Sequence, residues 1–427
     1  MKSTLILSLL HLVVDGLCAC CVYMLTASIG TELAFGMFLA YNALAFLTQP
    51  LTGHVLDAGR HGWRFLCIGV CLLELGGLLT FVSSVLSFVT PRLACLAILM
   101  VGLGNSLFHV FGGKTVAVST HNDVRHLGVF VSTGALGLLL GQEFAGSHGT
   151  LLILMAFMAI LCLAFRTRFA LRTESVTPSP LVRSGISASL MLFMMLLVFI
   201  RSFMGQMAAP DTALPLVAVL MVVLTFLGKS TGGLVACRLG IWRTLCGTLL
   251  MACVFFLSSG WHVVFCLALV LAVNLTMPLT LHLANRSLPG REGLAFGLLA
   301  ASLIPGFALG SYCVQSVVAW QLTYPLTATI LIEALVLLFI RERRWTVLAM
   351  SLVMNILTNV PLNLLALSLP ALQTSLPLQF GAEFVVVVLE TTLYFVVLHN
   401  ARQALSYAIL CNAVSYLCGI LYTIGNF

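Results

Sequence analysis

The first apolar run of the chain contains two ionisable residues, His11 and Asp15, that stand one helical turn apart. Residues four positions apart lie on the same face of an α-helix, so the imidazole and the carboxyl group can contact each other. Histidine titrates near neutral pH, which suits such a pair to taking up and releasing protons. The pattern predicts a proton site, and the alternative is a hydrogen-bonded pair with a structural role only.

Four more polar residues fall within other apolar runs: Asn105 and His109 in the fourth, Arg201 in the seventh and Asn274 in the tenth. Ionisable side chains in hydrocarbon are costly, and they are functional by default. Arg201 could pair with a carboxylate or bind an anionic substrate, or it could extend to the outer membrane interface. His109 is equally compatible with function and with structure. Asn105 and Asn274 could instead form hydrogen bonds between packed helices.

The elements that must position these residues are transmembrane helices. Hydrophobic residues make up 61% of the 427 residues and charged residues only 8%, whereas a soluble domain carries roughly 25% charged residues. A spanning helix needs about 20 apolar residues, and the chain offers fifteen such runs. They cover residues 5–25, 33–51, 65–89, 93–110, 127–141, 151–165, 186–207, 214–227, 245–258, 263–281, 294–314, 322–340, 345–369, 384–398 and 404–423.

The runs divide into six, six and three. We expect an N-terminal six-helix half at 1–165, a basic cytoplasmic linker at 166–185, a second half at 186–340 and an extra three-helix membrane segment at 345–427. Cytoplasmic loops carry an excess of Lys and Arg. With the N-terminus in the cytoplasm, only Arg92 falls in an outer loop. This predicts a multi-pass protein of a bacterial-type inner (plasma) membrane with an extracytoplasmic C-terminus.

The two six-helix sets share one asparagine followed by three glycines at the same steps of 23, 9 and 4 residues. Transporters are often built from such repeats, and glycine at these positions lets helices approach closely. The matching residues are Asn105, Gly128, Gly137 and Gly141 in the first set, and Asn274, Gly297, Gly306 and Gly310 in the second.

Two six-helix sets joined by a basic linker resemble the major facilitator superfamily of transporters. The loop after the second run, with Gly53, Asp57, Arg60 and Arg64, is similar to the cytoplasmic signature of that superfamily: a glycine, an aspartate four residues on, and then basic residues. The resemblance implies an all-α polytopic fold and a charge network that holds the cytoplasmic gate closed. It does not account for residues 345–427.

A narrower resemblance is to the fosmidomycin-resistance-like branch. It rests on His11 with Asp15 in the first run and on the Phe108-His109 pair in the fourth, and it covers residues 1–340. In this superfamily helices one, four, seven and ten line a central cavity, which would bring His11, Asp15, Asn105, His109, Arg201 and Asn274 together. The branch contains drug exporters, so export is slightly favoured.

The chain departs from these patterns at two positions. Val110 stands where the branch would place a proline, and Ala236 stands where the repeat would place a second gate aspartate. The substrate is therefore left open by the resemblance.

Glu74 and Glu333 lie mid-run in the third and twelfth segments, at the periphery of such a fold. We expect the C-terminal helices to cover Glu333 with polar stripes that hold helices together; the alternative is a second ion or ligand site. The stripes are Asn355, Asn359 and Asn363, then Glu383 and Glu390, then Asn412, Ser415 and Tyr416.

These features predict a secondary transporter of a small molecule, coupled to protons through His11 and Asp15, with access alternating between two six-helix halves. The alternative is a non-transporting membrane sensor or assembly partner. No nucleophile–base constellation or nucleotide-binding motif is present in the sequence, so we expect no enzyme, no cofactor and no metal site. The expected partners are the substrate, protons and the lipid bilayer, and not nucleic acid.

Overall fold

The computed structural model describes residues 2–27, 29–59, 62–86, 90–169, 187–209, 215–260, 262–314, 316–369, 372 and 375–425, and the statements below concern these residues. Arg60 and residues 170–185 of the predicted linker lie outside them. Within the described ranges the chain is helical and has no strand. Fifteen helices are long and apolar enough to cross a membrane, which is the predicted number.

The first six spans comprise α1 (Lys2–Thr26), α2 (Thr31–Asn42) continued through a π-helical turn (Ala43–Leu47) into α3 (Gln49–Ala58), α4 (Gly62–Val85), α5 (Pro91–Ser119), α6 (Val124–Glu143) and α7 (His148–Phe169). The next six comprise α8 (Ala188–Met207), α9 (Pro215–Leu239), α10 (Ile241–Ser258), α11 (Val263–Leu275) continued by α12 (Met277–Ser287), α13 (Glu292–Cys313) and α14 (Val317–Phe339). The last three are α15 (Trp345–Ser368), α17 (Leu376–Leu398) and α18 (Ala401–Gly425).

Helix α9 is longer than predicted. Its apolar run ends at residue 227, but the helix continues to Leu239. The polar stretch that ends the run does not face water, because Lys229 lines an internal cavity and Gly232 is buried against a neighbouring backbone. Helix α5 likewise extends beyond residue 110 to Ser119.

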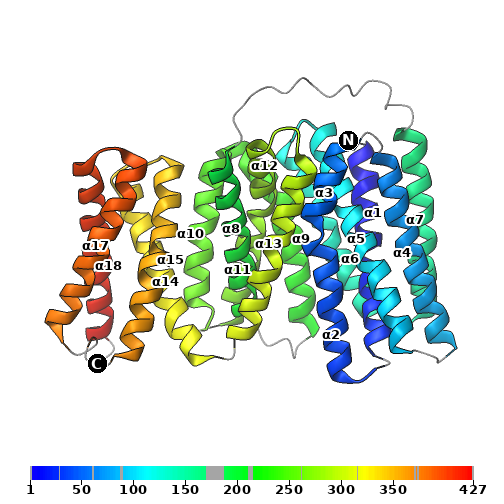
Figure 1. Ribbon diagram of the computed structural model, residues 1–427, viewed down its shortest axis with the longest axis horizontal. Helices are drawn as coiled ribbons and strands as arrows, with labels where there is room; N and C mark the ends of the chain where they lie inside the picture. Colours follow the sequence, from blue (N-terminus) through cyan, green and yellow to red (C-terminus); the bar gives the residue numbers. More distant parts are fainter. Residues whose placement is uncertain are drawn as a thin grey trace. The chain divides into compact units, whose positions relative to one another are not determined.

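The chain forms two compact units, residues 1–252 with 262–311, and residues 253–261 with 312–427. The first unit contains both predicted six-helix halves except α14 and the C-terminal ends of α10 and α13, so the bounds of the halves remain predictions. In this unit the N-terminus, α3 and α12 lie at the same end, the upper end in Figure 1.

Glycines of the predicted repeat make equivalent helix contacts in the two sets. A methyl group at Gly137 or at Gly306 would overlap the backbone of the first helix of its own set, α1 or α8. A methyl group at Gly128 or at Gly297 would overlap the backbone of the second helix of the other set, α9 or α3. Each glycine of the first set thus contacts the same kind of helix as the matching glycine of the second set. This is what two halves related by a repeat require.

The second unit is held together by a buried polar chain and an apolar core. Glu333 on α14 is fully buried, and Asn355 on α15 donates to its Oε2 at 2.6 Å. Glu390 on α17, also fully buried, accepts from Thr358 at 3.1 Å and from Asn412 on α18 at 2.5 Å. The C-terminal helices therefore cover Glu333, as the sequence predicts.

Candidate substrate cavity and proton site

A cavity of about 340 Å³ lies inside the first unit, a volume within the range of small-molecule sites. Both helix sets contribute to its wall. Five of the six residues predicted to meet in a cavity line it: His11 and Asp15 from α1, Asn105 and His109 from α5, and Arg201 from α8.

Asp15 lies between two imidazole rings in the cavity wall. His11 Nε2 is 3.2 Å from Asp15 Oδ2, and His109 Nε2 is 3.3 Å from Asp15 Oδ1. The rings of His11 and His109 meet edge to face with centroids 4.6 Å apart. All three residues are buried, with 5–8% of their surface exposed.

Backbone carbonyls assign the hydrogen on each ring. His11 Nδ1 is 2.7 Å from Phe130 O, and His109 Nδ1 is 3.0 Å from Asn105 O. A carbonyl oxygen only accepts, so each Nδ1 carries the hydrogen, and in a neutral ring Nε2 presents a lone pair. Two lone pairs then face the carboxylate oxygens of Asp15. Each of these contacts becomes a hydrogen bond only when a proton is added.

The three facing atoms lie within 4.8 Å of one another, and nitrogen and oxygen donors at such spacing could also contact one metal ion. Spacing along the sequence does not indicate this set of possible metal ligands, because His109 is 94 residues away from Asp15.

Gly134 on α6 makes room for the cluster. A methyl group there would overlap Asp15 Oδ2 and would lie 2.6 Å from His11 Nε2. Gly137 and Gly141 let α6 lie directly against the α1 backbone, so a methyl group on this face must either displace side chains or separate the two helices. Sequence reasoning did not identify Gly134, which is one of 35 glycines.

The two helix sets are joined by hydrogen bonds at the end of the unit where α3 and α12 lie. Asp57 accepts from the backbone amides of Gly293 at 3.0 Å and Leu294 at 2.8 Å, at the N-terminus of α13. A carboxylate at this position is favoured by the helix dipole. Gly53 allows the approach, since a methyl group there would overlap the Gly293 carbonyl.

The basic partner of Asp57 is Lys114, at 2.9 Å. The resemblance pointed instead to Arg60, which lies outside the described residues, and to Arg64, which is exposed. At the same end, Asn122 donates to His282 O at 3.0 Å and accepts from Asn285 at 2.9 Å. These contacts join the two helix sets at the end predicted to be cytoplasmic.

No family model and no curated protein matches the chain. Solved structures do match. The fucose:proton symporter FucP of E. coli has a TM-score of 0.56 at 16% identity, over 75% of this chain and 91% of that chain. A bacterial homologue of the iron transporter ferroportin, in an outward-facing state, has a TM-score of 0.52 at 16% identity, over 74% and 93%. A structure of FucP described as a major facilitator superfamily transporter in the outward conformation has 0.55 at 15%, over 76% and 92%.

The chain has the major facilitator fold. At these identities the likeness shows the fold alone, and the resemblance to the fosmidomycin-resistance-like branch remains a prediction. In this fold α1, α5 and α8 are helices one, four and seven of the two six-helix sets, and each contributes residues to the cavity.

Helix ten of the major facilitator fold is α11 with α12, and its Asn274 is not among the cavity-lining residues. Asn274 donates to Val270 O of its own helix at 2.8 Å and packs against Gly228 on α9. The hydrogen bond of Asn274 therefore lies within its own helix, and not between helices as the second interpretation expected. Asn105 combines both roles, because it lines the cavity and donates to the Tyr41 hydroxyl at 2.6 Å.

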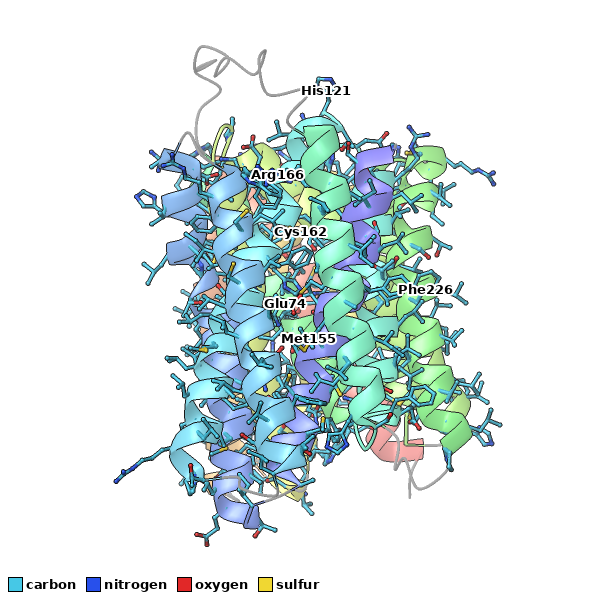
Figure 2. The ribbon with its side chains drawn as sticks, turned by 90° about the vertical axis from the view of Figure 1, so that its right-hand side faces the viewer. Glu74, His121, Met155, Cys162, Arg166 and Phe226 are labelled. Carbon is cyan, nitrogen blue, oxygen red and sulfur yellow. The ribbon has the colours of Figure 1, made fainter. Side chains whose placement is uncertain are left out.

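Lys229 on α9 also lines the cavity. It belongs to helix eight of the fold and is not among the cavity residues predicted from the sequence. A lysine inside a membrane-spanning helix is the feature that could have identified Lys229 as a cavity residue. Glu74, in contrast, lies away from the cavity lining, midway along the helices in Figure 2, and its Oε1 has no hydrogen-bond partner among the described residues.

Proposed function

We propose that the protein is a proton-coupled secondary transporter of a small molecule. One observation carries the proposal: a single carboxylate, Asp15, faces two imidazole nitrogens in the wall of an internal cavity. The number of protons in this cluster sets how many of its contacts are hydrogen bonds. A change of protonation therefore changes how the cavity wall is held together.

The cluster connects three helices of the first set. Asp15 and His11 belong to α1, His109 belongs to α5, and the carbonyl of Phe130 that orients His11 belongs to α6. Other titratable groups near Asp15 are Cys18, Tyr41 and, from α9, Lys229. Protonation would shift the balance between conformations that differ in these contacts, and Asp57 and Asn122 would release the contacts that join the two helix sets.

The fold supports transport, because a fucose:proton symporter and a ferroportin homologue share it. Export, a plasma-membrane location and a cytoplasmic N-terminus remain parts of the proposal. A non-transporting sensor or assembly partner would need no polar cavity, and an apolar, filled midplane would favour it. The cavity lined by Asp15, Asn105 and Arg201 supports the transporter instead.

The test is substrate-induced proton movement in vesicles. The purified protein is reconstituted with a pH-sensitive dye inside, and compound classes are added with and without an imposed pH gradient. We expect one class to move protons with the wild type and not with Asp15→Asn. Glu143→Gln, which changes an exposed carboxylate at the end of α6, is the matched control and should behave as the wild type does.

Two results would contradict the proposal. Equal gradient-driven flux in Asp15→Asn and in the wild type would remove the proton role of the cluster. Flux that depends on an added divalent metal and stops with a chelator would assign the cluster to a metal ion. A reporter fused after residue 427 tests the orientation separately, and a cytoplasmic signal would contradict the predicted topology.

A further inference from the structure

The second helix set contributes two cations to the cavity wall, Arg201 from α8 and Lys229 from α9. Arg201 is 92% buried, since only 8% of its surface is exposed, and its Nη1 has no hydrogen-bond partner in the described part of the chain. An arginine that extends to the membrane interface would be exposed. The burial of Arg201 therefore excludes that interpretation of the sequence.

These two cations are not neutralised by the cavity wall. Asp15 is the only acidic residue among those that line the cavity, and both its oxygens face imidazole nitrogens. No ion pair to Arg201 or Lys229 is found among the described residues. The two cations also repel each other, while Lys229 is attracted by Asp15. A buried charge without a partner is strongly destabilising, and an anion bound between the two cations would relieve it.

The rest of the wall is suited to an organic molecule. Aromatic rings from both helix sets line it, together with aliphatic side chains, so that most of the wall is apolar; the rings belong to Tyr23, Phe38, Tyr41, Phe46 and Phe296. Sites that bind small molecules combine such apolar walls with a few polar groups that fix orientation. An inorganic anion would leave the aromatic part of the cavity unused.

We propose that the cavity binds a small organic anion. Its carboxylate or phosphate group lies between Arg201 and Lys229, where guanidinium and ammonium groups donate to anionic oxygens, and its apolar body lies against the aromatic rings. This inference rests on the proposed function, because it assigns the substrate class of the same cavity. In this arrangement the cations that hold the anionic group belong to the second helix set, and the proton site, His11–Asp15–His109, belongs to the first.

The test is binding, measured without any gradient by calorimetry on the full chain in lipid nanodiscs, with empty nanodiscs subtracted. The probes are benzoate and phenyl phosphate as anions, benzamide as an uncharged match and benzylamine as a cation. We expect the two anions to bind at least about tenfold more tightly than benzamide or benzylamine. The stronger of the two anions identifies the head group.

Arg201→Gln should weaken anion binding roughly 10- to 100-fold, the range for loss of a hydrogen bond to a charged group. Lys229→Gln should act in the same direction, and Arg201→Lys should lose less than Arg201→Gln. Arg238→Gln, which removes an exposed cation in the last turn of α9, is the matched control and should leave binding unchanged. If Arg201→Gln does not fold, weaker anion binding by Lys229→Gln and by Arg201→Lys tests the same inference.

Equal binding of benzoate and benzamide, preference for benzylamine, or no binding of either anion at millimolar concentration would overturn the inference. So would anion binding that persists unchanged in Arg201→Gln and Lys229→Gln. These outcomes are separable from failure of the proposed function. Proton movement driven by a neutral or cationic compound would support the proton-coupled transporter and contradict the anion site. Anion binding without proton movement would support the anion site and contradict the proton-coupled transporter.

Discussion

Replacing Gly134 by alanine should separate the proton site from the fold. The added methyl group would overlap Asp15 Oδ2 and would lie 2.6 Å from His11 Nε2 and 3.0 Å from His11 Cε1. These atoms are the ends of side chains, which can rotate into the cavity. Separating the helices instead would also break the close contact of Gly137 on α6 with Leu12 O on α1, so we expect the side chains to move.

We expect the Gly134→Ala variant to lose little folding stability but much of its proton movement. Overpacking costs about 1–3 kcal/mol, and alanine in a helix regains about 0.5–1 kcal/mol relative to glycine. The net loss is therefore at most about 2.5 kcal/mol. Displacement of Asp15 from His11 removes a charge-assisted contact of about 1.5–3 kcal/mol, so we expect proton movement to fall at least about tenfold.

Two further Gly→Ala variants calibrate the result. Gly36→Ala on α2 has nothing within 4 Å of the new methyl group and should match the wild type in melting temperature and in proton movement. Gly137→Ala would overlap a backbone carbonyl of α1 and should fail to give a stable protein. The assays are thermal unfolding in detergent and dye-reported proton movement in vesicles. Wild-type proton movement in a folded Gly134→Ala variant would refute the reasoning.

Three other variants test the remaining contacts. Asp57→Ala should speed hydrogen exchange at the amides of Gly293 and Leu294 and open that end of the protein, because it removes a helix cap worth about 0.5–2 kcal/mol; unchanged exchange, measured by mass spectrometry, would contradict this. Asn355→Leu should lower stability by about 1.5–3 kcal/mol by removing a hydrogen bond to Glu333, and thermal unfolding of this variant with and without Glu333→Gln measures their coupling. The Arg344 guanidinium holds the pKa of Glu342, in the loop before α15, at about 2, below its usual value of 4.5. Because this pKa is lowered on folding, its contribution is present above that usual value and is lost as pH falls toward about 2; Arg344→Gln should move this loss to higher pH in melting curves.

Helix count and the pairing of His11 with Asp15 could be predicted, because both depend on spacing along the chain. Apolar runs of spanning length indicate helices, and an i, i+4 pair shares a face whatever surrounds it. The equivalent roles of Gly137 and Gly306 also follow from spacing, since a repeat preserves the order of contacts.

Contacts between distant segments could not be predicted in the same way. Asp57 meets an amide 236 residues further along the chain, and the resemblance suggested arginines as its partners where the structure has Lys114. Gly134 matters only because of which face α6 presents to α1. The predicted apolar run ends at residue 227, just before Lys229. A polar residue that faces an internal cavity cannot be distinguished, from the sequence, from one that faces water.

The complete burial of Glu333 has a consequence for synthesis of the chain. Helix α14 precedes α15, α17 and α18, so it leaves the ribosome before any helix that contacts its carboxyl group. An ionised side chain at the centre of a lone helix costs roughly 2.5–3.5 kcal/mol on insertion scales. The nascent α14 must therefore wait, either neutral or near the lipid headgroups, until Asn355 arrives on the next helix. Ribosome-bound chains that stop shortly before residue 355 should accordingly hold α14 less securely in the bilayer than chains that extend past it.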